Sequence, residues 1–244
     1  MPTPRAAAAL DRGQQLGQQI GQQLGDQLSA VVEEVKPRLR GWLHLVTSPL
    51  VVAAGIVLVA QSPNPMTRTG SAVFAGTAAL LFTVSAIYHR GRWGPRAWAF
   101  LRRFDHANIF LLIAGSYTPF TLLMLEGRSR VELLTVVWSG ALLGVLFRVL
   151  WTGAPRWLYV PLYMALGWAA VIYRDEFVAA GSGEVFALVV AGGALYTLGG
   201  LVYGLRRPDP FPSWFGFHEV FHALTVLAFA AHYVGVWLAT YSVR

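Results

Sequence analysis

Two histidines near the end of the chain are spaced so that both can bind one metal ion. His218 and His222 lie in the segment 216–222, Gly-Phe-His-Glu-Val-Phe-His, at the start of a long apolar stretch. On a helix, residues four apart share one face, with Cβ atoms about 6 Å apart. Placing an ionisable side chain in or beside a membrane costs free energy, so such residues usually have a function. The pair therefore predicts part of a metal centre, which other residues must complete.

Composition places this pair in a membrane protein. The 244 residues are 55% hydrophobic and only 13% charged, whereas a soluble domain carries about 25% charged residues. The apolar residues run in blocks of about 20, the length that spans a bilayer. A net charge of +7 would suggest nucleic acid for a soluble chain, but in a membrane protein it reflects topology. Because the chain has no cysteine, its metal ligands must be histidines or carboxylates.

Seven apolar segments predict an all-α membrane protein, a seven-transmembrane helix bundle. Residues 1–40 precede them as a Gln-rich segment that is too polar to span, which we interpret as a cytoplasmic tail, partly disordered or lying on the membrane surface. The functional domain is therefore expected to be 41–244. The segments lie near 42–60, 71–89, 107–125, 131–150, 156–173, 184–204 and 217–240.

Basic residues predict how the bundle is oriented. Lys and Arg collect in cytoplasmic loops, so we expect a cytoplasmic N-terminus and a C-terminus outside. The loop at 90–104 falls on the inner side, and its interleaved tryptophans and arginines are typical of a segment at the headgroup layer. With this orientation the inner segments carry most of the 19 Lys and Arg residues, and the outer ones carry only Arg68, Arg128, Arg130, Arg174 and Arg244.

The same topology brings further polar side chains to the level of the histidine pair. His89 ends the second segment on the inner side, and Asp105 begins the third there. Three histidine ligands with an open position form a catalytic zinc arrangement, in which the pKa of bound water falls to about 7. Asp105 fits a water-orienting or general-base role. Ser85, one turn before His89, could assist the ligand shell or a developing oxyanion.

Four stretches together resemble the hemolysin III family, which shares a superfamily of seven-span proteins with the progestin and adiponectin receptors and the alkaline ceramidases. The resemblance covers about 41–240. It implies that zinc is bound near the cytoplasmic face by His89, His218 and His222, with Ser85 and Asp105 completing the polar site. The stretches are Ser-Ala-Ile-Tyr-His at 85–89, Phe-Asp-His at 104–106, Ala-Gly-Ser-Tyr-Thr-Pro-Phe at 114–120 and His-Glu-Val-Phe-His at 218–222.

The resemblance implies a function directed at lipids. Relatives hydrolyse lipid amides, notably ceramide, so the first hypothesis is a zinc-dependent hydrolase of a lipid amide or ester. The alternatives are a non-enzymatic receptor-like or membrane-homeostasis sensor with structural zinc, and a pore-forming hemolysin. Membrane lipid, including a lipid substrate, is the expected partner, and nucleic acid is not. The expected location is the inner (cytoplasmic) membrane of a bacterium, and self-association as a homo-oligomer is left open.

A zinc metalloprotease is a competing interpretation of the histidine pair. The segment 218–222 matches the H-E-x-x-H signature, in which Glu219 would be the general base. The seven-span order, the third histidine and the glutamine that matches Glu219 in related receptors argue against it.

Three further histidines are expected to make structural polar contacts. His232 lies about 15 Å beyond His222 along the helix, too far to bind the same ion. His106 follows Asp105 and is expected to point elsewhere on its helix. His44, at the inner end of the first segment, is left open as a second-shell residue.

Overall fold

The computed structural model describes residues 37–151, 153–180 and 183–242, together with the isolated positions 14, 15, 17 and 21. The predicted tail at 1–40 therefore lies almost wholly outside the described residues. In the described part of the chain, β-type pairing is limited to one isolated bridge between Phe211 and Phe215. The helices are α2 (Trp42–Ala60), α3 (Pro65–Arg90), α4 (Pro95–Met124), α5 (Gly127–Leu150), α6 (Arg156–Gly167), the 3₁₀ helix η1 (Ala169–Tyr173), α7 (Arg174–Ala179), α8 (Gly183–Leu205) and α9 (Phe217–Ser242).

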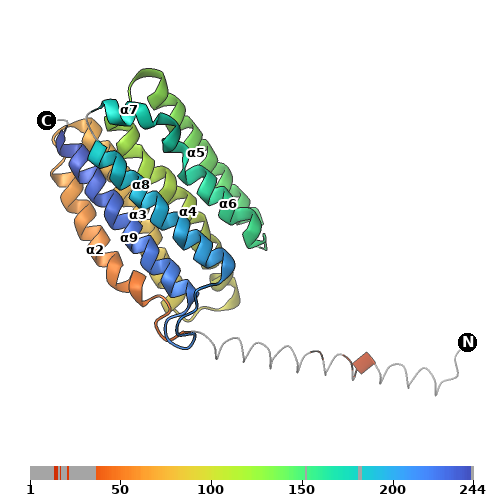
Figure 1. The fold of residues 1–244 in the computed structure, drawn as a ribbon. Helices are drawn as coiled ribbons and strands as arrows, with labels where there is room; N and C mark the ends of the chain where they lie inside the picture. Colours follow the sequence, from red (N-terminus) through yellow and green to blue (C-terminus); the bar gives the residue numbers. More distant parts are fainter. Residues whose placement is uncertain are drawn as a thin grey trace, which may run out of the picture.

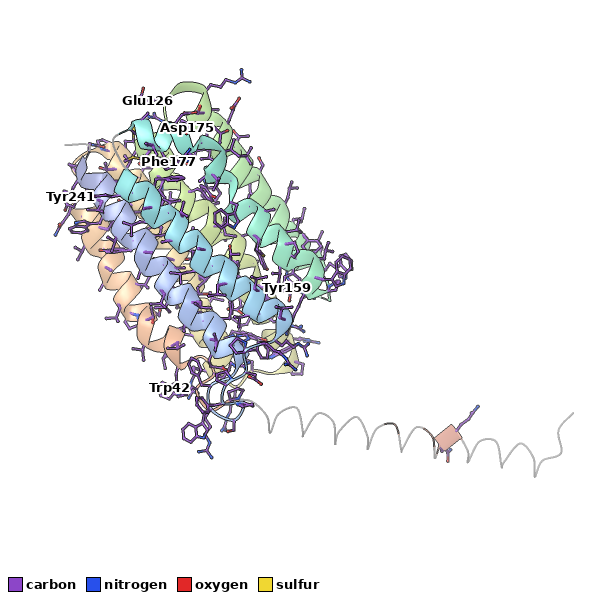
Figure 2. The ribbon with its side chains drawn as sticks, in the orientation of Figure 1. Trp42, Glu126, Tyr159, Asp175, Phe177 and Tyr241 are labelled. Carbon is purple, nitrogen blue, oxygen red and sulfur yellow. The ribbon has the colours of Figure 1, made fainter. Side chains whose placement is uncertain are left out.

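Six helices are long and apolar enough to cross a membrane, and they pack lengthwise into one bundle (Figure 1). They are α2, α3, α4, α5, α8 and α9. Helices with apolar residues on every side are typical of membrane spans, and α2 and α5 expose large hydrophobic side chains on the outside of the bundle (Figure 2). The prediction of an all-helical, multi-pass membrane protein is confirmed. The exposed side chains include Val46, Leu50, Ile56, Leu142, Leu143 and Leu146.

The fifth predicted segment, 156–173, differs from the prediction because it is not one continuous helix. It is divided after Gly167 into α6 and η1, and α7 follows. Figure 2 labels Tyr159 near the lower end of the bundle and Asp175 near the upper end, so these pieces together run along the bundle. The 12 residues of α6 and the 5 of η1 span about 18 Å and about 10 Å. Their sum is close to the ~30 Å hydrocarbon core of a bilayer.

The hydroxyl of Tyr117 in α4 bridges this break. It donates to the carbonyl oxygen of Gly167 at 2.6 Å and accepts from the backbone N–H of Ala170 at 3.1 Å. Backbone groups that a broken helix leaves free at membrane depth need protein partners, because the hydrocarbon offers none. Tyr117 therefore allows the interruption to be buried within the bundle.

The central helix of the bundle is α4. Of its apolar window 72% is buried, compared with 28% for α2 and for α5. A Cβ at Gly115 would lie 1.9 Å from Thr77 Oγ1 of α3, so the approach of these two helices requires glycine. Small residues let membrane helices approach this closely. The contact fixes α3 against α4, and with it the separation of His89 and Asp105.

The start of α4 lies further toward the N-terminus than predicted. Pro95 occupies the first turn, where its fixed φ and missing N–H suit a helix start. The residues from 95 to 104, predicted as part of a loop, are therefore helical. The arginines of this stretch make it too polar to cross a membrane, so the sequence predicted a loop. A helix can, however, extend beyond the membrane.

We predict that Tyr117→Phe lowers the free energy of unfolding by about 1–3 kcal/mol, because two buried backbone groups lose their partner. Thermal unfolding in detergent micelles measures the effect. The matched control is Tyr233→Phe, which removes a single hydrogen bond to the carbonyl oxygen of Ala54 and should cost about 0.5–1.5 kcal/mol. A Tyr117 variant as stable as the wild type would show that the bridge is dispensable.

Candidate metal centre

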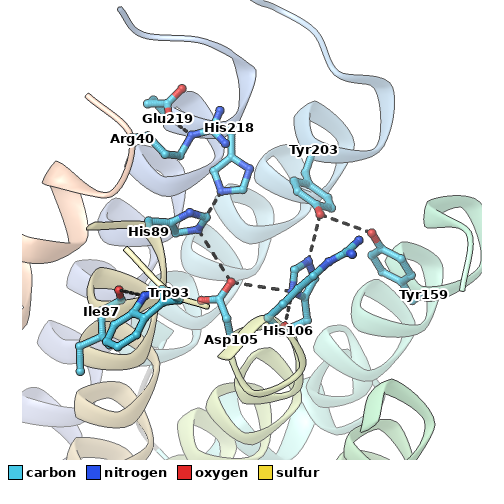
Figure 3. A network of polar contacts seen from close by, with 11 residues as sticks. Arg40, Ile87, His89, Trp93, Asp105, His106, Tyr159, Tyr203, His218 and Glu219 are labelled. Carbon is cyan, nitrogen blue, oxygen red and sulfur yellow. Dashed lines mark hydrogen bonds and ion pairs between the residues drawn. The ribbon is translucent and has the colours of Figure 1, made fainter. Parts of the chain in front are cut away.

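Helix α3 ends and α9 begins at the lower end of the bundle (Figure 1), and imidazoles from these two helices meet there. His89 lies in the last turn of α3, and His218 and His222 lie in the first turns of α9. One ligand atom from each histidine lies within 4.8 Å of the other two. The Nε2 atoms of His89 and His218 are 3.2 Å apart (Figure 3). The three side chains that spacing and topology singled out thus converge.

The spacing of the His89 and His218 nitrogens fits two ligands of one tetrahedral metal ion. With metal–nitrogen bonds of about 2.0–2.1 Å, two ligands of a tetrahedral site lie about 3.3–3.4 Å apart, close to the 3.2 Å between His89 and His218. His89 and His222 are only 7% and 3% exposed, so the site is shielded from water. The triad could therefore hold a metal ion, and its imidazole donors are compatible with zinc.

Asp105 and Ser85 lie beside the triad. The Oδ2 atom of Asp105 is 3.8 Å from His89 Nε2 (Figure 3), too far for a hydrogen bond. At this distance the carboxylate could instead reach a fourth ligand of the metal. Ser85 is 2% exposed, and it lines the same cavity as Asp105, His218 and His222. All five residues predicted for the site are thus neighbours.

Glu219 has different partners. Its carboxylate pairs with the Arg40 guanidinium (Figure 3) and accepts a hydrogen bond from the backbone N–H of Gly216 at 2.9 Å. The side chain is 1% exposed. In the H-E-x-x-H signature the glutamate must face the metal-bound water to act as a general base. Here the carboxylate caps α9 and attaches it to the segment before α2, which argues against the protease interpretation.

Residues 37–41 form a collar around the start of α9. The backbone N–H groups of residues 38 and 39 donate to carbonyl oxygens of the loop before α9, at 3.0 and 3.1 Å, and Arg40 adds its ion pair. Gly41 has a φ of +80°, and a Cβ there would lie 2.6 Å from the Cβ of His89. Glycine is the residue that adopts this conformation without penalty. The collar therefore supports both helices that carry the triad.

His44 packs directly on a triad member. Its ring stacks on that of His222, with centroids 3.9 Å apart and planes within 6°. It is 2% exposed, and neither of its ring nitrogens has a hydrogen-bond partner among the described residues. The stacking restricts the orientation of the His222 ring, a supporting role that the sequence left open.

His106 makes structural polar contacts, as expected, and it also lines the cavity that His218 and His222 line. Its Nδ1 donates to the carbonyl oxygen of Arg102 at 2.8 Å, and its Nε2 lies 3.2 Å from the Tyr203 hydroxyl. Because α4 is central, adjacent residues on it can both face neighbouring helices. His232 makes the expected structural contact, with Nε2 at 3.2 Å from the Val189 carbonyl oxygen.

A cavity extends from the triad toward the middle of the bundle, between α4, α6, α8 and α9. Asp105, Ser85, His218 and His222 line its lower end. A largely apolar cavity with a few convergent polar groups is the usual form of a small-molecule site. Most of the cavity wall beyond this lower end is hydrophobic. Its residues include Leu81, Ile109, Leu112, Ile113, Val160 and Met164.

Comparison with known proteins agrees with the motifs. Residues 32–233 match the family described as Haemolysin-III related. The chain belongs to the hemolysin III family. The family predicted from the four motifs is thereby confirmed, and the match covers every residue of the candidate centre.

Individual relatives extend the family assignment. This hemolysin III family member is 28% identical over 201 residues to the Hemolysin-3 homolog of Bacillus subtilis (strain 168), covering 82% of this chain and 91% of the relative. It is 30% identical over 165 residues to Hemolysin-3 of Bacillus cereus, covering 66% and 74%. It is also 30% identical over 153 residues to the adiponectin receptor protein of Drosophila melanogaster, covering 55% of this chain and 34% of that receptor.

We predict that His89→Gln, His218→Gln and His222→Gln each abolish stoichiometric metal binding, because two imidazoles cannot hold the ion as three do. Elemental analysis of the purified protein measures the metal per chain. His106→Gln is the matched control, since His106 adjoins Asp105 but stands outside the triad. Equal metal content in all four variants would exclude the triad as the binding site.

We predict that Gly41→Ala weakens metal binding about 10–100-fold, the usual effect of disturbing residues that orient a ligand. The new Cβ would collide with His89 and shift its imidazole. Gly76→Ala is the control, because a Cβ at Gly76 on the same helix as His89 meets nothing within 4 Å. Competition with a chelating dye gives both affinities. Wild-type affinity in the Gly41 variant would contradict a positioning role for the collar.

Proposed function

We propose that this protein is a zinc-dependent hydrolase of a lipid amide or ester. The observation that supports this most is the placement of the His89, His218 and His222 triad at one polar end of a largely apolar cavity, which His218 and His222 line beside Asp105 and Ser85. A hydrocarbon chain would occupy the apolar part, which would leave the amide or ester at the histidines. Polar side chains that converge in an apolar cavity are expected to orient and activate a ligand.

The residues of the centre would divide the chemistry among them. Zinc bound by three histidines with an open position supplies a Lewis acid and lowers the pKa of a coordinated water. The Asp105 carboxylate would orient the attacking water and accept its proton. Ser85, which lines the same cavity as Asp105, would hold that carboxylate in place or donate to the developing oxyanion. Burial of the triad would exclude competing bulk water.

The substrate would enter sideways from the lipid. Gly193, Thr197 and Gly200 of α8 and Met164 of α6 line the cavity and are only partly buried. Because the outer surface of these helices faces hydrocarbon, the line between α6 and α8 would admit an acyl chain directly. An entrance on this side suits a membrane lipid better than a soluble substrate.

The proposed setting is the inner (cytoplasmic) membrane of a bacterium, crossed seven times with the N-terminus in the cytoplasm. The broken segment α6–η1 would supply the seventh crossing beside the six long helices. The start of α2 and the end of α9 lie at opposite ends of the bundle (Figure 1), in keeping with an odd number of crossings. Lys and Arg counts favour the lower end, and thus the metal centre, as the cytoplasmic side.

We expect purified protein in liposomes to release fatty acid from lipids of a panel that includes ceramide, other N-acyl lipids and esters. His218→Ala should remove both zinc and turnover. Asp105→Asn should keep zinc but lower turnover about 10²–10⁴-fold, because it removes a general base. Glu219→Gln is the control and should keep turnover, because residue 219 does not face the triad and a glutamine oxygen can still accept from Arg40 and Gly216.

The outcomes separate the competing functions. Equal release by wild type and His218→Ala would end the hydrolase proposal, and loss of turnover in Glu219→Gln alone would favour a protease-type site. Zinc binding that raises the unfolding temperature without turnover would favour a receptor-like sensor. That alternative is supported by the similarity to a Drosophila protein named as an adiponectin receptor. Ion flux through the liposomes would instead support a pore-forming hemolysin.

A further inference from the structure

The cavity has a second polar end, in the middle of the bundle. Ser116 of α4, Tyr196 of α8 and His232 of α9 line it there. His232 lies ten residues beyond His222, and Ser116 lies eleven beyond Asp105 on a helix that runs the same way (Figure 1). These separations correspond to about 15 Å and about 16 Å. The rings of Tyr196 and His232 have centroids 5.5 Å apart, so these side chains share one depth well away from the metal centre.

The polar atoms at this end are buried and unpartnered. The Ser116 hydroxyl, the Tyr196 hydroxyl and His232 Nδ1 have no hydrogen-bond partner among the described residues. Ser116 and His232 are only 4% and 8% exposed. Buried polar groups in proteins are nearly always hydrogen-bonded, and in a membrane an unpaired group is especially costly. Three of them on one cavity wall indicate a place where a ligand supplies the partners.

Other hydroxyls on the same wall are satisfied within the protein. Thr197 and Thr225 also line the cavity, and each donates to the carbonyl four residues earlier in its own helix, at 2.8 and 2.9 Å. This is the usual arrangement for a hydroxyl in a membrane helix. Ser116 could make the same bond but does not, which sets its hydroxyl apart from its neighbours.

The available groups select the kind of ligand. His232 Nε2 lies against the Val189 carbonyl oxygen, which can only accept, so Nε2 carries the hydrogen and Nδ1 is an acceptor. The Ser116 and Tyr196 hydroxyls can both donate and accept. A hydroxyl on the ligand could donate to Nδ1 and accept from either hydroxyl. A carbonyl would leave Nδ1 unpaired, and a carboxylate would find no cation among these three residues.

We propose that Ser116, Tyr196 and His232 bind a hydroxyl group carried partway along the hydrocarbon chain of a lipid whose head lies at the metal centre. The inference rests on the proposed role of the cavity in holding a lipid and narrows its substrate to hydroxylated chains. The site lies about 15 Å from the triad along α9, so the metal cannot contact this hydroxyl. The hydroxyl-binding site therefore affects how tightly and how selectively the lipid binds, and it does not contact the bond that reacts.

The test is a binding series of stearic acid and hydroxystearic acids that carry the hydroxyl near the carboxyl, in mid-chain or at the methyl end. Displacement of a fluorescent fatty acid from the zinc-loaded protein gives the affinities. We expect a mid-chain isomer to bind about tenfold more tightly than stearic acid, the gain of about one well-placed hydrogen bond. Tyr196→Phe and Ser116→Ala should each reduce this preference, while Thr225→Val, an isosteric change at a satisfied hydroxyl, should preserve it.

The wild-type series is decisive even if a variant fails to fold. Equal affinity for all isomers would overturn the proposal. So would a mid-chain preference that remains in the Tyr196→Phe, Ser116→Ala double variant. Either result would mean that water, and not a ligand, supplies the partners of the three groups. The assay does not depend on turnover. Selective binding without hydrolysis would contradict the proposed hydrolase function and support the hydroxyl-binding site. Hydrolysis without selective binding would support the hydrolase function and contradict the hydroxyl-binding site.

Discussion

The rest of this structure depends on one constraint: imidazoles and a carboxylate are brought together at one end of an apolar helix bundle. Polar groups in such surroundings must satisfy one another or bind a cation. The triad does this only if α3 and α9 are held in register. Gly115 lets α4 fix α3 from within the bundle, and the collar at 37–41 holds the start of α9 from outside. The bundle is therefore organised to keep three nitrogens within 4.8 Å of one another.

Much of the centre could be predicted because its signals are local or topological. The pair at 218 and 222 follows from helical spacing alone, and His89 and Asp105 follow from the alternation of consecutive segments, which predicts which segment ends share a side. Gly41 and Arg40 could not be found this way. Gly41 contacts His89 across 48 positions of chain, through a backbone turn that no periodicity records. The stacking of His44 on His222 likewise depends on how α2 leans against α9.

The divided fifth segment shows a second limit of sequence patterns. Hydropathy records how apolar a stretch is, and 156–173 is almost entirely apolar after Arg156. It does not record whether the backbone hydrogen bonds run uninterrupted, since that depends on what lies opposite. Here the Tyr117 hydroxyl, supplied by α4, satisfies the groups on both sides of the break. Tyr117 belongs to a motif that was visible in the sequence, but its role requires the partner helix.

The meaning of the H-E-x-x-H spacing depends on where it lies relative to the helix start. In α9 the motif lies within the first two turns, with Gly216 just before the helix and Glu219 third within it. At that position a glutamate reaches back to the free backbone N–H groups of the helix end, and its charge is favoured by the helix dipole. The histidines on either side still point into the bundle. One sequence pattern thus yields a metal-binding pair and a helix cap, where deeper placement in a helix would make the same glutamate a neighbour of the metal.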